Sequence, residues 1–285
     1  MLGGSAVFVW VAGLLPYKDT WQTTSYQAHN RRSGVRGDPG HRIPPSILIG
    51  VSEEAPLLHA IVSILSGAPV AFGDCMRATT NVSILSVLSR QYGRLLKADV
   101  PIRSVDHTWL QKVFGTPGPA AAEIWSTTTI ITDRSYGVVM AAAHEVPVAP
   151  TLTQLHLPDV HSVAWRFQLA DKLGEDIQTV SITEGGALSI GAVAKEYGDG
   201  MFQLQFSSPV LPNGCAVLGE VGKAMLISPQ RTTAIRAVGD GVEVDIVGSA
   251  GEVVRIAFMS PAGAVSIVAA TIEDGGQLLC GQRIS

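Results

Sequence analysis

The sequence predicts an α/β segment followed by an all-β segment, and two observations support this fold class. Between Leu57 and Leu65, apolar residues recur at three- and four-residue spacings, which is typical of a helix. From Ile124 onward, valine, isoleucine and threonine are frequent and turn glycines recur at short intervals, a pattern that indicates an antiparallel sandwich or barrel. The proline- and glycine-rich sequence 116–119 marks the change. We therefore expect one unit at 1–116 and an antiparallel β-sandwich at 117–285.

The first expected helix runs directly into a turn, a short strand and a carboxylate. Gly67 can stop the helix because glycine tolerates the left-handed geometry of a helix C-terminus, and Pro69 prevents its continuation. A short apolar run then ends at Asp74. A helix, a turn, a strand and a terminal carboxylate form the kind of unit that closes a (β/α)8 barrel, in which the chemistry lies at the carboxyl ends of the strands. The sequence 1–116 is therefore expected to form the incomplete end of such a barrel.

Further elements follow from the same periodicities. A second helix is expected at 80–92, where apolar residues again recur at helical spacing and Gly93 provides a stop. In the sandwich, alternation and turn residues predict strands at 124–132, 136–143, 163–169 and 201–206, and a strand with Val242, Val244 and Ile246 on one face after the turn at 239–241.

Composition excludes several classes of protein. The 285 residues are enough to bury a sizeable core, and 46% are hydrophobic while only 15% are charged, so the chain is not disordered. A net charge of −4 argues against a nucleic-acid partner. The apolar run at 6–15 is too short to cross a bilayer and lacks the flanking signals of a secretion peptide, so we expect no membrane partner and leave the localisation open.

No cofactor or metal is predicted. Cys75, Cys215 and Cys280 are far apart, which fits neither a disulfide framework nor a metal site. His156 and His161 could serve as zinc ligands, but their spacing matches no established motif, and a solvated loop is the favoured interpretation. The sequence also lacks the signatures of serine hydrolases, P-loop proteins and dinucleotide-binding proteins.

Three residues are candidates for contact with a sugar. Asp19 and Trp21 combine a carboxylate, which accepts hydrogen bonds from hydroxyl groups, with an aromatic face that can cover the apolar side of a sugar ring. A surface loop anchored by one tryptophan is the alternative. Asp74 can point into a cleft at the end of its strand, or it can cap the following turn through its own backbone.

Five segments, taken in order, resemble the C-terminal part of raffinose-synthase-like and α-galactosidase-like glycoside hydrolases. They are residues 15–24, 93–101, 211–214, 218–223 and 228–231. The resemblance extends from about Leu14 to Arg231. It implies that the last strands and helices of a catalytic barrel lead into an antiparallel β-sandwich, and that the loop containing Asp19 borders the substrate cleft.

The resemblance also implies that the catalytic carboxylates are missing. In these enzymes the nucleophilic and the acid/base aspartates lie on strands before the segment that matches Asp19, and only eighteen residues precede Asp19 in this sequence. We therefore expect the C-terminal portion of a carbohydrate-active enzyme that is inactive alone, with no catalytic residue assigned and an oligosaccharide as its candidate ligand. The alternatives are a carbohydrate-binding or structural β-sandwich module, and one half of an enzyme whose barrel lies in a separate chain.

Overall fold

The structure, a computed structural model, describes residues 56–67, 82–106, 123–142, 147–158, 160–166, 177–191, 202–273 and 277–283. These residues form the helices α3 (Pro56–Leu65) and α4 (Val82–Leu88) and the short 3-10 helix η1 (Gln91–Gly93). Twelve strands follow: β1 (Arg103–Ser104), β2 (Glu123–Ile131), β3 (Arg134–Ala142), β4 (Ser162–Arg166), β5 (Gln178–Ile182), β6 (Phe202–Pro209), β7 (Ala216–Glu220), β8 (Thr232–Val238), β9 (Gly241–Val247), β10 (Val253–Met259), β11 (Val265–Thr271) and β12 (Gln277–Arg283). All the strand pairs among them are antiparallel, so the prediction of antiparallel sheets is confirmed.

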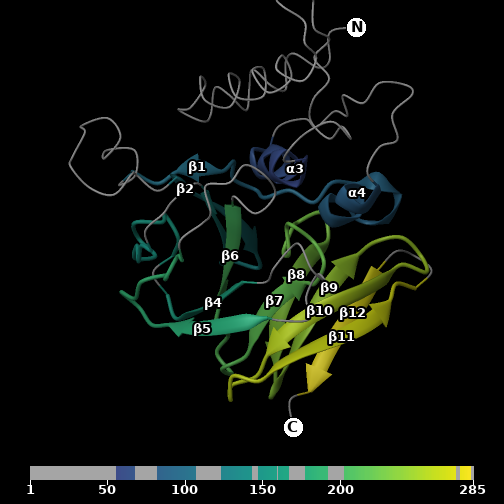
Figure 1. Cartoon of the computed structure of the whole chain (residues 1–285). Helices are drawn as coiled ribbons and strands as arrows, with labels where there is room; N and C mark the ends of the chain where they lie inside the picture. The colour runs from purple at the N-terminus through teal and green to yellow at the C-terminus, as the bar shows by residue number, and fades with distance from the viewer. Residues whose placement is uncertain are drawn as a thin grey trace, which may run out of the picture.

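The strands form one large sheet and two small ones. The large sheet has six strands in the order β1-β2-β3-β6-β4-β5, and the small sheets have the orders β11-β10-β7 and β12-β9-β8. The small sheets share a core that includes Val217 and Phe258 from one sheet and Ile235 and Val244 from the other. Figure 1 shows the two small sheets together, below α4. Strands β7–β12 are therefore consistent with the predicted β-sandwich, and its bounds at 117–285 stay a prediction.

Strands β7 and β10 have buried residues on both faces of their sheet. Along β10, Ile256 and Phe258 point into the core of the small sandwich. The alternate residues Ala257 and Met259 join a second core, which also contains side chains from both helices and from the large sheet. Because side chains alternate between the two faces of a strand, this one sheet separates two hydrophobic cores.

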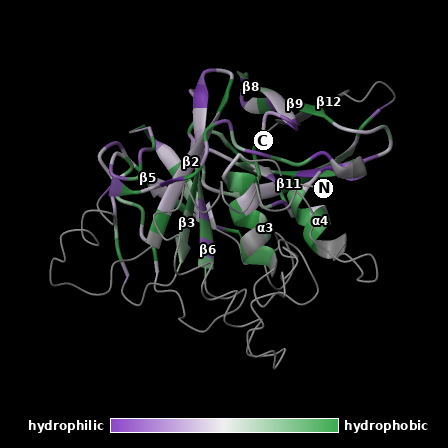
Figure 2. Ribbon diagram, turned by 90° about the horizontal axis from the view of Figure 1, so that it is seen from above, coloured by the Kyte–Doolittle hydropathy of each residue, from purple (hydrophilic) through white to green (hydrophobic). Residues whose placement is uncertain are grey.

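Helix α3 is more deeply buried than its sequence pattern indicates. The pattern predicts one apolar face, but Leu58, Ile61 and Ile64 are fully buried, and Ser63 is buried as well. Figure 2 shows the apolar character of α3 and its place beside β3 and β6. The helix therefore lies in a hydrophobic core. Its predicted end is confirmed, since Gly67 has a φ of +70°.

The second predicted helix is interrupted. Helix α4 covers the first part of the expected 80–92 range, and Arg90 adopts an extended conformation before η1. The chain doubles back there, so that Ser89 pairs with Leu95 and the Leu96 amide donates to the Leu88 carbonyl. The prediction of one continuous helix was wrong at these residues because this local hairpin replaces a helical turn.

Most of the predicted strands are confirmed. Strands β2 and β3 match the expected ranges, although the turn lies at Thr132 and Asp133, whose φ values are 48° and 61°, rather than at 133–135. Strands β4, β6 and β9 begin within one residue of the positions expected from the alternation. Residues 167–169, which were expected to continue β4, lie outside the described residues.

The barrel end stays a prediction. Between residues 56 and 106, the described residues contain two α-helices, η1 and the two-residue strand β1, which is antiparallel to β2. The strand expected before Asp74 and the boundary expected at 116–119 lie outside the described residues.

Candidate functional site

The three candidate sugar contacts, Asp19, Trp21 and Asp74, all lie outside the described residues. Their role therefore stays a prediction. Two other aspartates, which lie near the end of the helical segment, are described. Asp99 accepts a hydrogen bond from the Ile130 amide at 2.9 Å, and Asp106 lies 3.6 Å from His156 Nε2. Asp99 thus fastens the chain to strand β2.

The most elaborate polar site in the described residues is a buried charge cluster, which we name the junction cluster: Arg231, Glu220 and Glu252. Arg231 Nε donates to Glu220 Oε2 at 2.7 Å, and Arg231 Nη1 donates to Glu252 Oε2 at 3.0 Å. Nη2 donates to both carboxylates, and Nη1 also donates to the Val247 carbonyl at 3.0 Å. All five N–H groups of the guanidinium are thereby used, which is what a buried arginine requires.

The two carboxylates of the junction cluster differ electrostatically. Burial alone would raise the pKa of Glu252, but hydrogen bonds from Arg231 and from the Gln91 and Ser249 amides outweigh it and lower the pKa to about 2. For Glu220, burial dominates and raises the pKa, although the charges of Arg231 and Lys223 oppose this effect. Glu252 is therefore the more firmly ionised partner of Arg231.

Glu252 of the junction cluster and Lys223 both bind the helical segment. Glu252 Oε1 accepts from the Gln91 amide at 2.9 Å, which ties η1 to the sandwich. Lys223 Nζ donates to the carbonyls of Ser86 and Ser89, each at 2.7 Å, at the carboxyl end of α4. A cation at this end is favourable, because the last carbonyls of a helix lack partners and carry partial negative charge.

A second set of contacts joins the helical segment to the loop between β7 and β8. The Lys97 amide donates to Ser228 Oγ at 3.1 Å and to Gln230 Oε1 at 3.0 Å, while Ser228 Oγ donates to the Lys97 carbonyl at 2.9 Å. The Ala224 amide donates to the Val87 carbonyl at 2.9 Å. Residues 82–98 are thus fastened to the loop that connects β7 and β8.

Four segments of the resemblance can be placed in this structure. Segments 93–101, 218–223 and 228–231 meet at the contacts just described. Segment 211–214 forms a turn, in which Asn213 Nδ2 donates to the Gly241 carbonyl at 2.8 Å and so holds the hairpin of β8 and β9. The first segment, 15–24, lies outside the described residues.

Glu220 and Arg231 lie within these segments, but the sequence analysis did not predict that they contact each other. Glu252 was not among the residues that it singled out. A signal was available, since each is a charged residue within a largely apolar run that the sandwich buries, and such residues need a partner. The arrangement is suited to holding two parts together. Because both carboxylates are buried against Arg231, neither is placed to exchange protons with a substrate.

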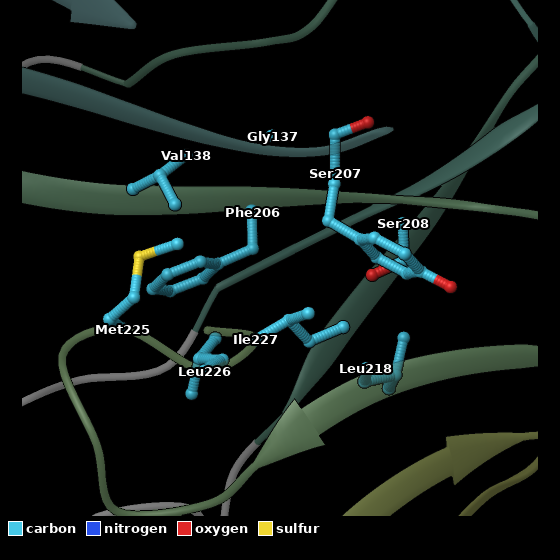
Figure 3. A pocket seen from close by; sticks show the side chains of 10 residues that line it. Gly137, Val138, Phe206, Ser207, Ser208, Leu218, Met225, Leu226 and Ile227 are labelled. Atoms are coloured by element: carbon cyan, nitrogen blue, oxygen red, sulfur yellow. The ribbon is translucent and has the colours of Figure 1, made fainter. Parts of the chain in front are cut away.

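A small cavity lies between β3, β6, β7 and the loop after β7. Its walls include Val138, Phe206, Leu218, Met225 and Ile227 (Figure 3). The volume of about 10 Å³ is enough for about one water molecule, far below what a sugar requires. The aromatic side chains whose exposure is described are all buried, namely Trp125, Tyr136, Trp165, Phe202, Phe206 and Phe258. None of these rings offers a sugar a stacking surface.

The histidines of the expected loop have separate surroundings. His156 is half-buried beside Asp106, and the exposed His161 lies 3.1 Å from Ser181 Oγ. Within the ranges that the structure describes, no group of three or more potential metal ligands occurs. Over the same ranges, no helix has the length and apolar character needed to span a membrane.

Comparison with known proteins adds no relative. The sequence matches no protein-family model, and no curated protein matches it.

Proposed function

We propose that this chain serves as the C-terminal portion of a carbohydrate-active enzyme related to α-galactosidases and raffinose synthases, without a catalytic carboxylate pair and without activity of its own. The observation that supports the proposal is the convergence of three segments of the resemblance, 93–101, 218–223 and 228–231, on one junction. The three segments would meet in this way if their role is to join the end of a barrel to the sandwich behind it.

We also propose a fold for residues 1–116. Residues 1–116 would form the incomplete end of a (β/α)8 barrel, with α3 and α4 among its last helices. Side chains of α3 share one hydrophobic core with residues of the large sheet and of β7 and β10, and this supports the assignment, because a helix docked in this way has a fixed orientation. The sandwich then acts as a rigid support for catalytic strands, which the same polypeptide or a separate barrel chain would supply.

An oligosaccharide is the proposed ligand, with Asp19, Trp21 and Asp74 as its contacts. Sugar sites use an exposed aromatic ring, and the described aromatic rings are committed to hydrophobic cores. This supports the placement of the stacking ring at Trp21. A site without further walls would be shallow, so water would compete for each hydrogen bond.

Titration with galactose and raffinose, followed by NMR, tests this proposal. We expect millimolar dissociation constants, equivalent to about −4 kcal/mol, and we expect Trp21→Ala to remove the binding. Trp10→Ala is the matched control, because Trp10 precedes the region of resemblance, and it should leave the affinity unchanged. Binding that survives Trp21→Ala would place the site elsewhere and favour the alternative of a sugar-binding sandwich.

A further inference from the structure

The hydroxyl group of Tyr136 is buried without a protein partner. Tyr136 is 3% exposed, and its hydroxyl oxygen has no hydrogen-bond partner among the described residues. A buried hydroxyl without a hydrogen bond is costly, so native proteins usually provide a protein partner or an ordered water molecule. Burial also raises the pKa of Tyr136, so the group stays protonated at neutral pH and can both donate and accept a hydrogen bond.

Tyr136 is one of the residues that line the small cavity between β3, β6, β7 and the loop after β7. The pairing of β3 with β6 ends at Gly137 and Ser207, and the walls of the cavity include residues 136–138 and 206–208 on either side of this last pair. The Tyr136 side chain belongs to the same core as Ile227, which the loop after β7 contributes to the wall. The cavity therefore lies where the large sheet meets the sandwich.

Ser208 provides a second hydroxyl group on the same face of the large sheet. Val138 lies opposite Phe206 in the register of β3 and β6, and side chains of a strand return to the same face at every second residue. Tyr136 lies two residues before Val138, and Ser208 lies two residues after Phe206, so the two hydroxyl-bearing side chains share this face. Ser208 is 2% exposed and also lines the cavity.

We propose that Tyr136 and Ser208 bind one ordered water molecule in this cavity. The volume of about 10 Å³ admits about one water molecule, and none of the described residues that line the cavity is charged, which favours a neutral ligand over an ion. A buried water molecule makes about three hydrogen bonds, and two of them are to these hydroxyl groups. The water thereby satisfies the Tyr136 hydroxyl at the place where the large sheet meets β7. This proposal does not depend on the proposed function.

Magnetic relaxation dispersion of the solvent oxygen tests the proposal on the full chain, because it counts the water molecules that stay bound for longer than the protein takes to tumble. We expect Tyr136→Phe to lower this number by about one relative to the wild type, and Ser208→Ala to do the same. Ser207→Ala is the matched control and should keep the wild-type number. Ser207 is the neighbouring residue, but alternation places its hydroxyl on the other face of β6, away from Leu218 and Leu226 (Figure 3).

Urea denaturation gives a second result that separates a bound hydroxyl from an unpartnered one. If the hydroxyl binds a water molecule, Tyr136→Phe should lower the equilibrium constant for folding about 2- to 10-fold, because a hydrogen bond is lost. If the hydroxyl has no partner, the same variant should leave the constant unchanged or raise it, because an unsatisfied polar group is removed. The proposal is overturned by that outcome, or if Tyr136→Phe keeps the wild-type number of bound water molecules. Should circular dichroism show that Tyr136→Phe does not fold, Ser208→Ala provides the same comparison.

Discussion

At the scale of single residues, Arg231 should contribute most to the stability of the junction. It is 1% exposed and neutralises two buried carboxylates, so its removal would leave both without a countercharge. We expect Arg231→Met to lower the free energy of unfolding by about 3–5 kcal/mol in urea denaturation. Arg236→Met is the control, since Arg236 pairs with Asp245 on the surface, and it should change little. Equal effects of the two variants would show that the junction cluster does not stabilise the fold.

Glu252 should make the free energy of unfolding depend on pH in the acidic range. Its folded-state pKa of about 2 lies below its ordinary value of 4.5, so the unfolded chain takes up the proton first as the pH falls. The stabilisation, up to about 3 kcal/mol, is complete above about pH 4.5 and is lost towards pH 2. The raised pKa of Glu220 has the opposite sign and makes stability fall as the pH rises through it.

Comparison of variants isolates the contribution of Glu252. Chemical denaturation between pH 6 and pH 2 should show a smaller loss of stability for Glu252→Gln than for the wild type. Glu243→Gln, on the outward face of strand β9, serves as the matched control and should keep the wild-type dependence. The same steep loss in all three proteins would rule out Glu252 as its source.

At the scale of elements, the loop after β7 depends on Gly219. Its φ is +112°, and a Cβ atom there would lie 2.6 Å from the Leu226 carbonyl oxygen. Gly263, in the turn between β10 and β11, also has a positive φ but has open space around it. Gly263→Ala should therefore cost about 1–2 kcal/mol in thermal or urea unfolding, and Gly219→Ala clearly more. If the two costs are equal, the close approach to Leu226 is not maintained in solution.

Elements with a clear period could be predicted from the sequence, and contacts between distant segments could not. The alternation at Val242, Val244 and Ile246 placed β9 correctly, since one face of the strand enters a core. The turn between β2 and β3 was expected at 133–135 but lies at Thr132 and Asp133. Both residues adopt left-handed conformations, which the alternation of apolar residues in the strands does not indicate.

The site was harder to predict than the strands. The hydrogen bond between Gln91 and Glu252 joins residues 161 positions apart, and no local period reports such a pairing. Likewise, the burial of Ser63 in α3 depends on sheets that are distant in the sequence. Glu220 and Arg231 both lie in segments of the resemblance, but only the fold shows that they contact each other.

At the scale of the whole molecule, the described part of the first predicted unit shares a core with the second. Side chains of α3 and α4 pack in one cluster with residues of the large sheet and of β7 and β10. Glu252 of the junction cluster and Lys223 fasten η1 and α4 by hydrogen bonds. We therefore interpret residues 82–98 as an integral part of the sandwich unit, and the division at residue 116 stays a prediction.

Turnover by the isolated chain tests the central claim most directly. We propose that this chain is the supporting part of a carbohydrate-active enzyme and has no catalytic pair; retaining glycosidases need two carboxylates about 5–5.5 Å apart that are free to act on a substrate. Aryl α-galactosides and raffinose should therefore be hydrolysed only at the background rate. Turnover above background that disappears in Asp19→Asn or Asp74→Asn would contradict the account and would show that this chain carries a catalytic carboxylate.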